Sequence, residues 1–344
     1  MKTLLVTGGY GFIGSHFIRL ILRERPQYRV VNFDLLTYAG NPANLAQETK
    51  TSNSSVYRFV RGDISDSRLV RETVQREDVD AIINFAAETH VDRSLLDSAP
   101  FLRTNIEGTR VLLDSAVQHR VQRFLQVSTD EVYGSLGPSD PPFTEEHPLR
   151  PNSPYAASKA AADLLVRAYH KSYAIPTLIT RCGNNYGPYQ FPEKFLSLFI
   201  TNALDDLPLP LYGDGLQIRD WIHVEDHVRA LLAVLERGKI GEIYNVSANG
   251  EQTNLSMAHQ VLRLMEKPES LLRSVTDRPG HDRRYALDAS KLREKVGWAP
   301  YVSFSDGLSM TIHWYRENKN WWQRIKNGAY QAYYEQQYGG RLVK

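Results

Sequence analysis

The first fourteen residues constrain the fold more strongly than any other segment. The apolar run KTLLVTG (2–8) has the composition of a buried strand, and glycines follow it at a spacing of three, at Gly8, Gly11 and Gly14. Glycine lets the backbone approach a pyrophosphate closely, and a helix that begins there offers its N-terminus to the anion. Glycine-rich turns serve many purposes. A turn placed between a first strand and a helix nevertheless predicts a dinucleotide site.

Further short apolar runs recur along the first half of the chain, with helical-looking segments between them. They are YRVVNFD (28–34), YRFVRGD (57–63), AIINFAA (81–87), RFLQVST (123–129) and PTLITRC (176–182). This alternation is typical of βαβ units and a parallel sheet. Near-continuous apolar strands indicate a sheet that is covered on both faces. The fold class predicted is therefore α/β, with a doubly wound parallel sheet.

A chain of 344 residues is too long for one small core. After about residue 183 the rhythm changes, because Pro, Gly and aromatic residues become denser and clear strands fewer. We predict a cofactor domain over 1–183 and a smaller lobe over 184–344. The run EIYNVS (242–247) could return to the main sheet, so the two units are expected to be interleaved.

Bulk properties exclude several classes of function. The net charge of +2 leaves no excess for tracking a nucleic-acid backbone. No apolar run approaches the roughly 20 residues needed to cross a bilayer. The single cysteine allows no internal disulfide, which fits a reducing compartment. We therefore expect a cytoplasmic protein without a membrane or nucleic-acid partner, and the histidine spacing suggests no metal site.

Acidic residues at strand ends predict the choice of dinucleotide. Asp34 ends the second predicted strand, twenty positions after Gly14. A carboxylate there can accept hydrogen bonds from the ribose hydroxyls of NAD and would repel the 2′-phosphate of NADP. The alternative is a carboxylate that only caps a turn. Asp63, at the end of the third predicted strand, could meet the adenine amino group, an assignment that rests on position alone.

The segment SPYAASKAAADLLVRAYH (153–170) has the strongest helical pattern in the chain. Ser153 can cap it, and Pro154 suits its first position. Tyr155 and Lys159 are four residues apart, so they share one face. A nearby ammonium would lower the pKa of the tyrosine toward a useful range. With Thr129 they form a constellation suited to hydride removal from an alcohol, in which Tyr155 takes the proton and Thr129 polarises the oxygen.

Two adjacent acids, Asp130 and Glu131, follow Thr129 where the chain leaves a strand in STDEVYG (128–134). On a solvated loop such a pair would be unremarkable in energy. In a partly dry pocket, each negative charge disfavours the other and at least one pKa rises. Next to Thr129 and in one chain with Tyr155 and Lys159, the pair predicts acid–base chemistry.

Several motifs together resemble the extended short-chain dehydrogenase/reductase family, and within it the dTDP-glucose 4,6-dehydratases. They include TGGYGFIGSH, STDEVYG, YAASK, FAAETHVDRS, NNYGPYQFPEKF, RDWIHVEDH and DRPGHDRRY, spread over nearly the whole chain. The resemblance implies a Rossmann-type fold, tightly bound NAD and usually a homodimer. In the family the dimer uses long helices that match 100–119 and 153–172 here.

The resemblance also implies separate roles for the two acids. Such an enzyme oxidises C4 of the glucosyl group, eliminates water across C5–C6 and returns the hydride to C6. It uses the residue matching Asp130 as general acid at the C6 hydroxyl and the residue matching Glu131 as general base at C5. The activity implied is conversion of dTDP-glucose to dTDP-4-keto-6-deoxyglucose.

Further site residues carry over by motif. The cofactor set adds to the glycines, Asp34, Asp63, Tyr155 and Lys159 the residues Phe12, Ile13, Leu35, Thr37, Ile64, Phe85, Ala86, Ala87, Thr104 and Asn185. Besides Thr129, the substrate set comprises Thr89, Asn184, Lys194, Phe195, Pro210, Leu211, Tyr212, Arg219, Asn254, Arg278 and His281. Arg219 and Arg278 are the expected diphosphate partners, because guanidinium forks suit phosphate oxygens.

Two alternatives stay open at this point. One is another NAD-dependent nucleotide-sugar enzyme, such as a UDP-glucose 4,6-dehydratase or a 4-epimerase, which needs no acid pair. The other is a non-catalytic sensor that binds NAD, although such proteins typically lose the Tyr–Lys pair. The closing aromatic stretch HWYRENKNWWQ (313–323) is expected to pack on the second lobe rather than to bind a ligand.

Overall fold

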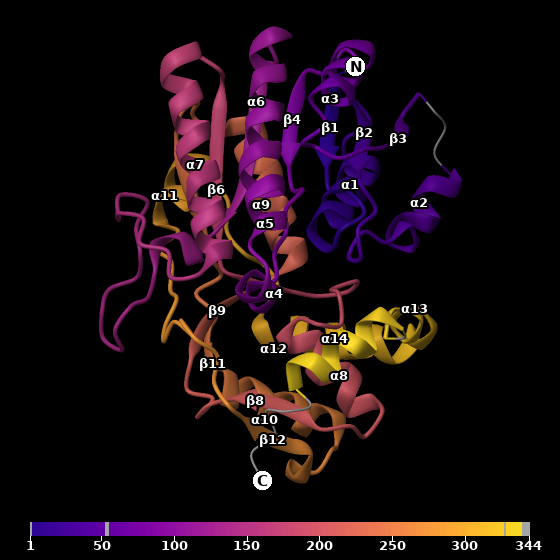
Figure 1. The fold of residues 1–344 in the computed structure, drawn as a ribbon, viewed down its shortest axis with the longest axis vertical. Coiled ribbons are helices and arrows are strands. Elements are labelled where there is room, and N and C mark those ends of the chain that lie inside the picture. Colours follow the sequence, from indigo (N-terminus) through magenta and orange to yellow (C-terminus); the bar gives the residue numbers. More distant parts are fainter. Residues whose placement is uncertain (1, 52–54, 327, 339–344) are drawn as a thin grey trace.

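A seven-stranded sheet organises the larger lobe of the molecule (Figure 1). The computed structural model describes residues 2–51, 55–326 and 328–338. The sheet order is β10-β6-β5-β4-β1-β2-β3, and every neighbouring pair runs parallel. The predicted doubly wound α/β fold is confirmed. The run 242–247 supplies β10 (Ile243–Val246), which pairs with β6 at the edge of this sheet.

The elements of the larger lobe follow one another as strand and helix. They are β1 Lys2–Thr7, α1 Phe12–Glu24, β2 Tyr28–Asp34, η1 Pro42–Leu45, α2 Ala46–Thr51, β3 Tyr57–Arg61, α3 Ser67–Arg76, β4 Ala81–Asn84, α4 Val91–Leu96, α5 Ala99–Phe101, η2 Leu102–Gly108, α6 Thr109–Gln118, β5 Arg123–Thr129, η3 Asp130–Tyr133, α7 Pro154–Tyr173 and β6 Thr177–Cys182.

The remaining elements build the smaller lobe, except that α9, β10 and α11 pack in the larger lobe. They are β7 Asn184–Tyr186, α8 Phe195–Leu204, β8 Leu209–Tyr212, β9 Ile218–His223, α9 Val224–Arg237, β10, β11 Glu251–Thr253, α10 Asn254–Met265, η4 Glu269–Leu271, β12 Leu272–Val275, α11 Ser290–Val296, α12 Phe304–Glu317, α13 Lys319–Ile325 and α14 Ala329–Tyr338.

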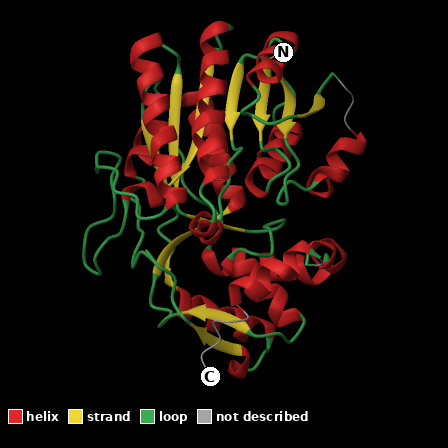
Figure 2. Ribbon diagram, viewed as in Figure 1, coloured by secondary structure: helices red, strands yellow, loops and turns green. Residues whose placement is uncertain are grey.

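Helices cover both faces of the main sheet (Figure 2). Apolar side chains of α1, α9 and α11 pack against one face, and those of α3, α6 and α7 pack against the other. A separate apolar core joins α8, α10, α12 and Trp322 of α13 in the smaller lobe. Because β10 is a strand of the main sheet and α9 and α11 pack against it, the two lobes are interleaved along the sequence. No helix in the described part of the chain is long and apolar enough to cross a membrane.

Two predicted strands end earlier than expected. The structure ends β3 at Arg61 and β4 at Asn84, whereas the sequence suggested 63 and 87. Residues 62–63 and 85–87 leave the sheet and line a cavity at its edge. Strands also continue beyond residue 183, but they are only three to six residues long in two small sheets, too short for a clear pattern.

The helix that carries Tyr155 and Lys159 begins where the sequence predicts. Ser153 Oγ accepts a hydrogen bond from Ala156 N at 3.1 Å, and Pro154 takes the first position. The helix ends at Ala174, whose φ of 56° is left-handed. Beside it the expected helix 100–119 is interrupted by η2, a π-helical stretch. From η2, Asn105 Nδ2 donates to Ser158 Oγ at 2.8 Å and to Glu88 O at 3.0 Å.

A buried ion pair joins this helix to the sheet. Arg181 Nε of β6 lies 2.9 Å from Asp163 Oδ2 of α7, and both side chains are less than 5% exposed. The same guanidinium lies 4.8 Å from the ring centroid of Tyr133, in the turn that carries the two acids. The pair therefore holds strand, helix and acid-bearing turn together.

Removing one partner of that pair should destabilise the fold strongly, because it leaves a buried charge without compensation. Asp163→Asn is expected to lower the free energy of unfolding by about 3–5 kcal/mol, measured by urea denaturation. Glu72→Gln is the control, since the Arg68–Glu72 pair is solvent-exposed and should contribute little to the free energy of unfolding. Equal losses in the two variants would contradict the role assigned to Asp163.

Candidate active site

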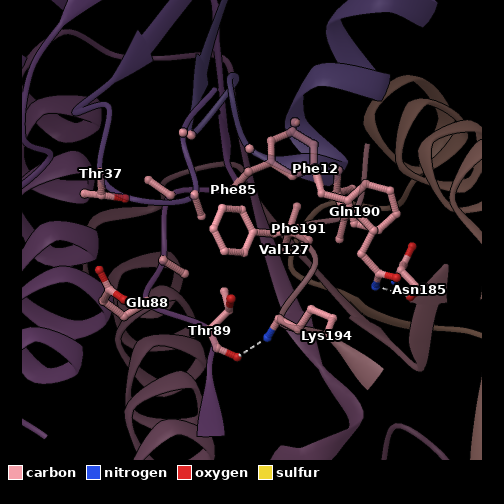
Figure 3. A pocket seen from close by; sticks show the side chains of 18 of the residues that line it. Phe12, Thr37, Phe85, Glu88, Thr89, Val127, Asn185, Gln190, Phe191 and Lys194 are labelled. Carbon is pink, nitrogen blue, oxygen red and sulfur yellow. Dashed lines mark hydrogen bonds between the residues drawn. The ribbon is translucent and has the colours of Figure 1, made fainter. Parts of the chain in front are cut away.

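A cavity lies at the carboxyl edge of the main sheet, where the strand order reverses between β1 and β4. This is the place where open α/β sheets bind ligands. The loops that follow β1, β2, β3, β4 and β5 line it, together with the start of α7 and residues from the smaller lobe. Figure 3 shows part of this lining, with Phe12, Phe85 and Val127 on one side and Gln190 and Lys194 on another.

Every residue assigned to the cofactor from the sequence lines this cavity. They are Gly8, Gly11, Phe12, Ile13, Gly14, Asp34, Leu35, Thr37, Asp63, Ile64, Phe85, Ala86, Ala87, Thr104, Tyr155, Lys159 and Asn185. Of the other assigned residues, Thr89, Thr129, Asp130, Glu131, Asn184, Lys194 and Phe195 line it too. The fold thus brings the fingerprint, the strand-end acids and the Tyr–Lys helix into one space.

The glycine loop fits a dinucleotide pyrophosphate. Gly8 has a φ of +66°, and a Cβ on Gly14 would lie 2.4 Å from Gly8 O, so the loop closes only with glycine at these positions. Gly11 precedes α1, and no side chain caps that helix. The first N–H groups of α1 and its dipole are therefore directed at the cavity, as an anion site requires.

Asp34 caps the turn after β2 and also faces the cofactor cavity. Its two carboxylate oxygens accept hydrogen bonds from Tyr10 N at 2.9 Å and Leu36 N at 2.7 Å, so it caps the turn after β2. It is 7% exposed and lines the cavity, and burial raises its pKa. Each carboxylate oxygen keeps a second lone pair for a ribose hydroxyl. The residues present therefore fit NAD.

The pKa of Tyr155 differs from the expectation. Burial raises it above the ordinary value, the neighbouring Glu131 adds to the rise, and a hydrogen bond with Thr129 opposes it. The amine of Lys159 donates to Val127 O at 2.7 Å, and burial lowers its pKa to about 8. The predicted lowering of the Tyr155 pKa is therefore wrong for this structure. Helix spacing places Tyr155 and Lys159 on one face, but burial of a phenolate raises its pKa.

Asp130 and Glu131 line the cavity rather than a solvated loop, with Asp130 buried and Glu131 partly buried. Asp130 is 2% exposed, and Thr129 Oγ1 donates to its Oδ1 at 3.2 Å. Within the described residues its Oδ2 has no partner. Burial raises the pKa of Asp130 well above its usual range, and the charges of Glu131 and Asp220 add to this.

Glu131 is less strongly perturbed. Burial raises its pKa, but Arg278, Arg219 and Lys194 act to lower it. All three cations belong to the smaller lobe, whereas both acids lie at the end of β5. Of the two, Asp130 has the stronger reason to keep its proton and Glu131 the stronger reason to lose it, which is the division that an acid–base pair needs.

Lys194 connects the two lobes at the substrate end of the cavity. Its Nζ donates to Thr89 O at 2.8 Å, a bond drawn in Figure 3. Burial lowers its pKa. Phe195 and Asn184 stand beside it in the lining, so the position suits recognition of a polar ligand that extends from the catalytic residues.

The remaining residues assigned to the substrate lie beyond the lining of this cavity. They are Pro210, Leu211, Tyr212, Arg219, Asn254, Arg278 and His281, in the smaller lobe. Arg278 Nη1 lies 3.1 Å from Asp92 Oδ1, and Tyr212 donates to Asp92 Oδ2 at 3.1 Å. Arg219 Nη2 donates to Asp282 O at 3.0 Å. Both guanidinium groups therefore have protein partners here.

Sequence analysis missed several lining residues. Glu193 is buried and pairs with Arg93 at 2.9 Å, and Glu88, labelled in Figure 3, also lines the cavity. Gln190 and Phe191 lie inside a quoted motif that could have indicated them. Trp321 comes from the closing aromatic stretch, and no pattern near it indicates a site. Its neighbour Trp322 does pack in the smaller lobe as expected.

No group of three or more His, Cys, Asp or Glu side chains that could hold a metal ion occurs among residues 2–51, 55–326 and 328–338. In the cavity, the Thr–Tyr–Lys set lies beside the acid pair. These groups can move protons at adjacent atoms of one small molecule.

Comparisons with known proteins agree on one family. A family model described as GDP-mannose 4,6 dehydratase matches residues 5–311. A dTDP-glucose 4,6-dehydratase of Streptomyces niveus is 49% identical over 328 residues, which covers 94% of this chain and 96% of the relative. The dTDP-glucose 4,6-dehydratase of Streptomyces venezuelae, solved with NAD and TYD bound, is 50% identical with a TM-score of 0.90, covering 94% of this chain and 100% of that one.

An epimerase structure gives a more distant match. The UDP-glucose 4-epimerase of Thermotoga maritima, solved with UDP-glucose, is 27% identical with a TM-score of 0.85. It covers 92% of this chain and 100% of its own. The fold is thus shared with epimerases, while the relatives near half identity are dehydratases.

The burial of Asp130 predicts a pH-dependent effect on stability. Because its folded pKa lies above the unfolded value near 3.8, its contribution is fully present below that value and is lost as pH rises through the folded pKa. The unfolding free energy of Asp130→Asn minus that of the native chain should therefore increase over this range. Urea denaturation at a series of pH values measures it, with the exposed Glu294→Gln as control. A difference that stays constant with pH would refute the expectation.

Proposed function

The chain belongs to the GDP-mannose 4,6-dehydratase family and, within it, to the dTDP-glucose 4,6-dehydratases, and we propose that it converts dTDP-glucose to dTDP-4-keto-6-deoxyglucose with NAD as resident cofactor. One observation carries this proposal. A buried acid, Asp130, and a partly buried one, Glu131, which differ in how many cations lie near them, adjoin Thr129 and Tyr155 in one cavity. Oxidation alone would need no such pair.

The Thr–Tyr–Lys set serves the oxidation at C4. Tyr155 takes the proton of the C4 hydroxyl, and Thr129 donates a hydrogen bond to the same oxygen. When bound, NAD supplies the hydride acceptor and later the donor, and its positively charged nicotinamide favours the phenolate of Tyr155. Lys159 stays fixed through Val127 O, so its amine can hold a ribose hydroxyl without losing its position.

The acid pair performs the elimination. Once C4 is a ketone, the C5–H bond is acidic. Glu131 takes the C5 proton while the C6–O bond breaks, and Asp130 gives its proton to the departing hydroxyl, which leaves as water. A hydride then returns to C6, and a proton is added at C5. Glu131 thus acts at C5 and Asp130 at the C6 oxygen.

Residues of the smaller lobe hold the nucleotide in this proposal. Arg219 and Arg278 contact the diphosphate, and Arg278 exchanges part of its contact with Asp92 for phosphate oxygens. Pro210, Leu211 and Tyr212 face the base, Lys194 and Phe195 the nucleotide, and Thr89, Asn184, Asn254 and His281 complete the site. Residues 1–183 serve as the NAD domain and 184–344 as the nucleotide-sugar lobe, with the interleaving described above.

Exposed leucines on neighbouring helices support our proposal that the chain forms a homodimer, and we place it in the cytoplasm. Leu96, Leu102 and Leu164 are 56%, 50% and 56% exposed. Leu102 and Leu164 lie on η2 and α7, within the segments that the family resemblance assigns to the dimer, and Leu96 ends α4, which packs beside α7. Exposed leucines gathered on neighbouring helices are costly unless another surface covers them.

Incubation with dTDP-glucose in deuterated water tests the activity. The product should have lost one water and carry one deuterium at C5, because the proton added there comes from solvent after Glu131 has removed the original one. Mass spectrometry and proton NMR detect both changes. A sugar isomer of unchanged formula would instead indicate a 4-epimerase, and absence of any product with NAD bound would indicate a sensor.

The paired variant Asp130→Asn with Glu131→Gln is the control for the assigned roles in the same assay. It keeps the shape of both side chains, but it removes the proton that Asp130 donates and the carboxylate with which Glu131 accepts one. It should still bind substrate but form no dehydrated product. Dehydration at the native rate in this variant would exclude the acid pair.

Charge on the exposed leucine face should separate the proposed dimer. Leu164→Asp is expected to give a monomer in size-exclusion chromatography with light scattering, because an interface core tolerates an unpaired charge poorly. Met310→Asp, on α12 and 50% exposed, is the matched control and should leave the assembly unchanged. A native chain that is already monomeric would contradict the proposal.

A further inference from the structure

Trp321 of α13 reaches from the smaller lobe into the cofactor cavity. Its Nε1 donates a hydrogen bond to Asn44 Oδ1 at 3.0 Å, across 277 positions of sequence. Asn44 lies in η1 of the larger lobe and is 2% exposed. Trp321, Gly40, Asn41 and Phe191 line both the cofactor cavity and a second hollow behind it. These residues therefore form the wall between the two spaces.

A second hydrogen bond connects Asn44 to the dinucleotide loop. Asn44 Nδ2 donates to Tyr10 O at 2.9 Å, and Tyr10 belongs to the glycine loop before α1. Asn41 N donates to the same carbonyl at 3.0 Å. Because Trp321 donates to Asn44 Oδ1, it fixes the amide in the orientation that points Nδ2 at Tyr10 O. A side chain of the smaller lobe thus orients a contact of the loop that faces the pyrophosphate.

Aromatic packing holds Trp321 in this position. Its ring lies 5.2 Å from Trp314 and 5.8 Å from Tyr189, measured between centroids, and both contacts are edge-on. Arg19 of α1 lies 4.6 Å from the centroid of Tyr189 and also donates to Asn44 O. The indole is therefore anchored on the smaller lobe and joined to α1, which begins at the cofactor loop.

We propose that Trp321 is a positioning residue that retains NAD, by holding Asn44 and through it the glycine loop in the closed arrangement. The need for retention rests on the proposed function, since a hydride removed at C4 must return to C6 of the same sugar. If the reduced cofactor left between these steps, the hydride needed at C6 would be lost and the reaction would stop at the oxidised sugar. The contact itself is independent of which sugar reacts.

Exchange of bound NAD tests the proposal without any sugar. Holoenzyme is mixed with excess deuterium-labelled NAD, desalted at intervals, and the bound cofactor is analysed by mass spectrometry. Trp321→Phe keeps an aromatic ring in the wall but removes the N–H donor. It should exchange NAD about five-fold faster, as expected for the loss of one neutral hydrogen bond. Asn44→Ala, which removes the acceptor, should accelerate exchange at least as much.

The matched control and the double variant distinguish a relay from general loosening. Trp322 Nε1 donates to Tyr315 O at 2.9 Å within the smaller lobe, so Trp322→Phe loses an equivalent bond and should exchange NAD at the native rate. Adding Trp321→Phe to Asn44→Ala should bring no further acceleration, because the partner is already absent. Native exchange in Trp321→Phe, equal acceleration in Trp322→Phe, or multiplied effects in the double variant would each overturn the proposal.

Discussion

The reversal of strand order between β1 and β4 is the constraint on which the rest of the molecule depends. Helices leave β1 and β4 toward opposite faces of the sheet, so a crevice opens at the carboxyl edge that neither layer of helices can fill. The loops after five strands end in this crevice, which places the glycine loop, Asp34 and the acid pair within one cavity. Each of these groups is local to its own strand end, and only the topology brings them together.

Burial of charge at this edge decides what chemistry is possible. The larger lobe supplies both carboxylates, and the cations that lower the pKa of Glu131 come from the smaller lobe. Of these cations only Arg219 acts to lower the pKa of Asp130. Burial and two neighbouring carboxylates raise that pKa well above its usual range. The division between an acid and a base therefore depends on how the two lobes meet, and neither lobe alone would establish it.

Much of this could be predicted from the sequence because it is encoded locally. The strand 123–129, the capped helix that begins at Pro154, and the glycine loop each follow from patterns within a few residues. The pKa of Tyr155 could not be obtained this way, since it depends on burial and on Glu131 more than on helix spacing. Trp321 and the Arg93–Glu193 pair were missed for a related reason, because each joins segments that are far apart in the chain.

Residues after 318, at the end of the smaller lobe, contact the larger lobe again. Besides the Trp321 contact, Tyr333 of α14 lies 3.9 Å from the guanidinium carbon of Arg93, and Tyr38 from the loop after β2 lies 4.2 Å from the same carbon. Arg93 in turn pairs with Glu193 in the cavity lining. Cation–π contacts of this kind tolerate small shifts of the rings better than a directional hydrogen bond does. A closing segment that combines both types can hold the lobes together, and its Trp321 bond reaches the cofactor loop through Asn44.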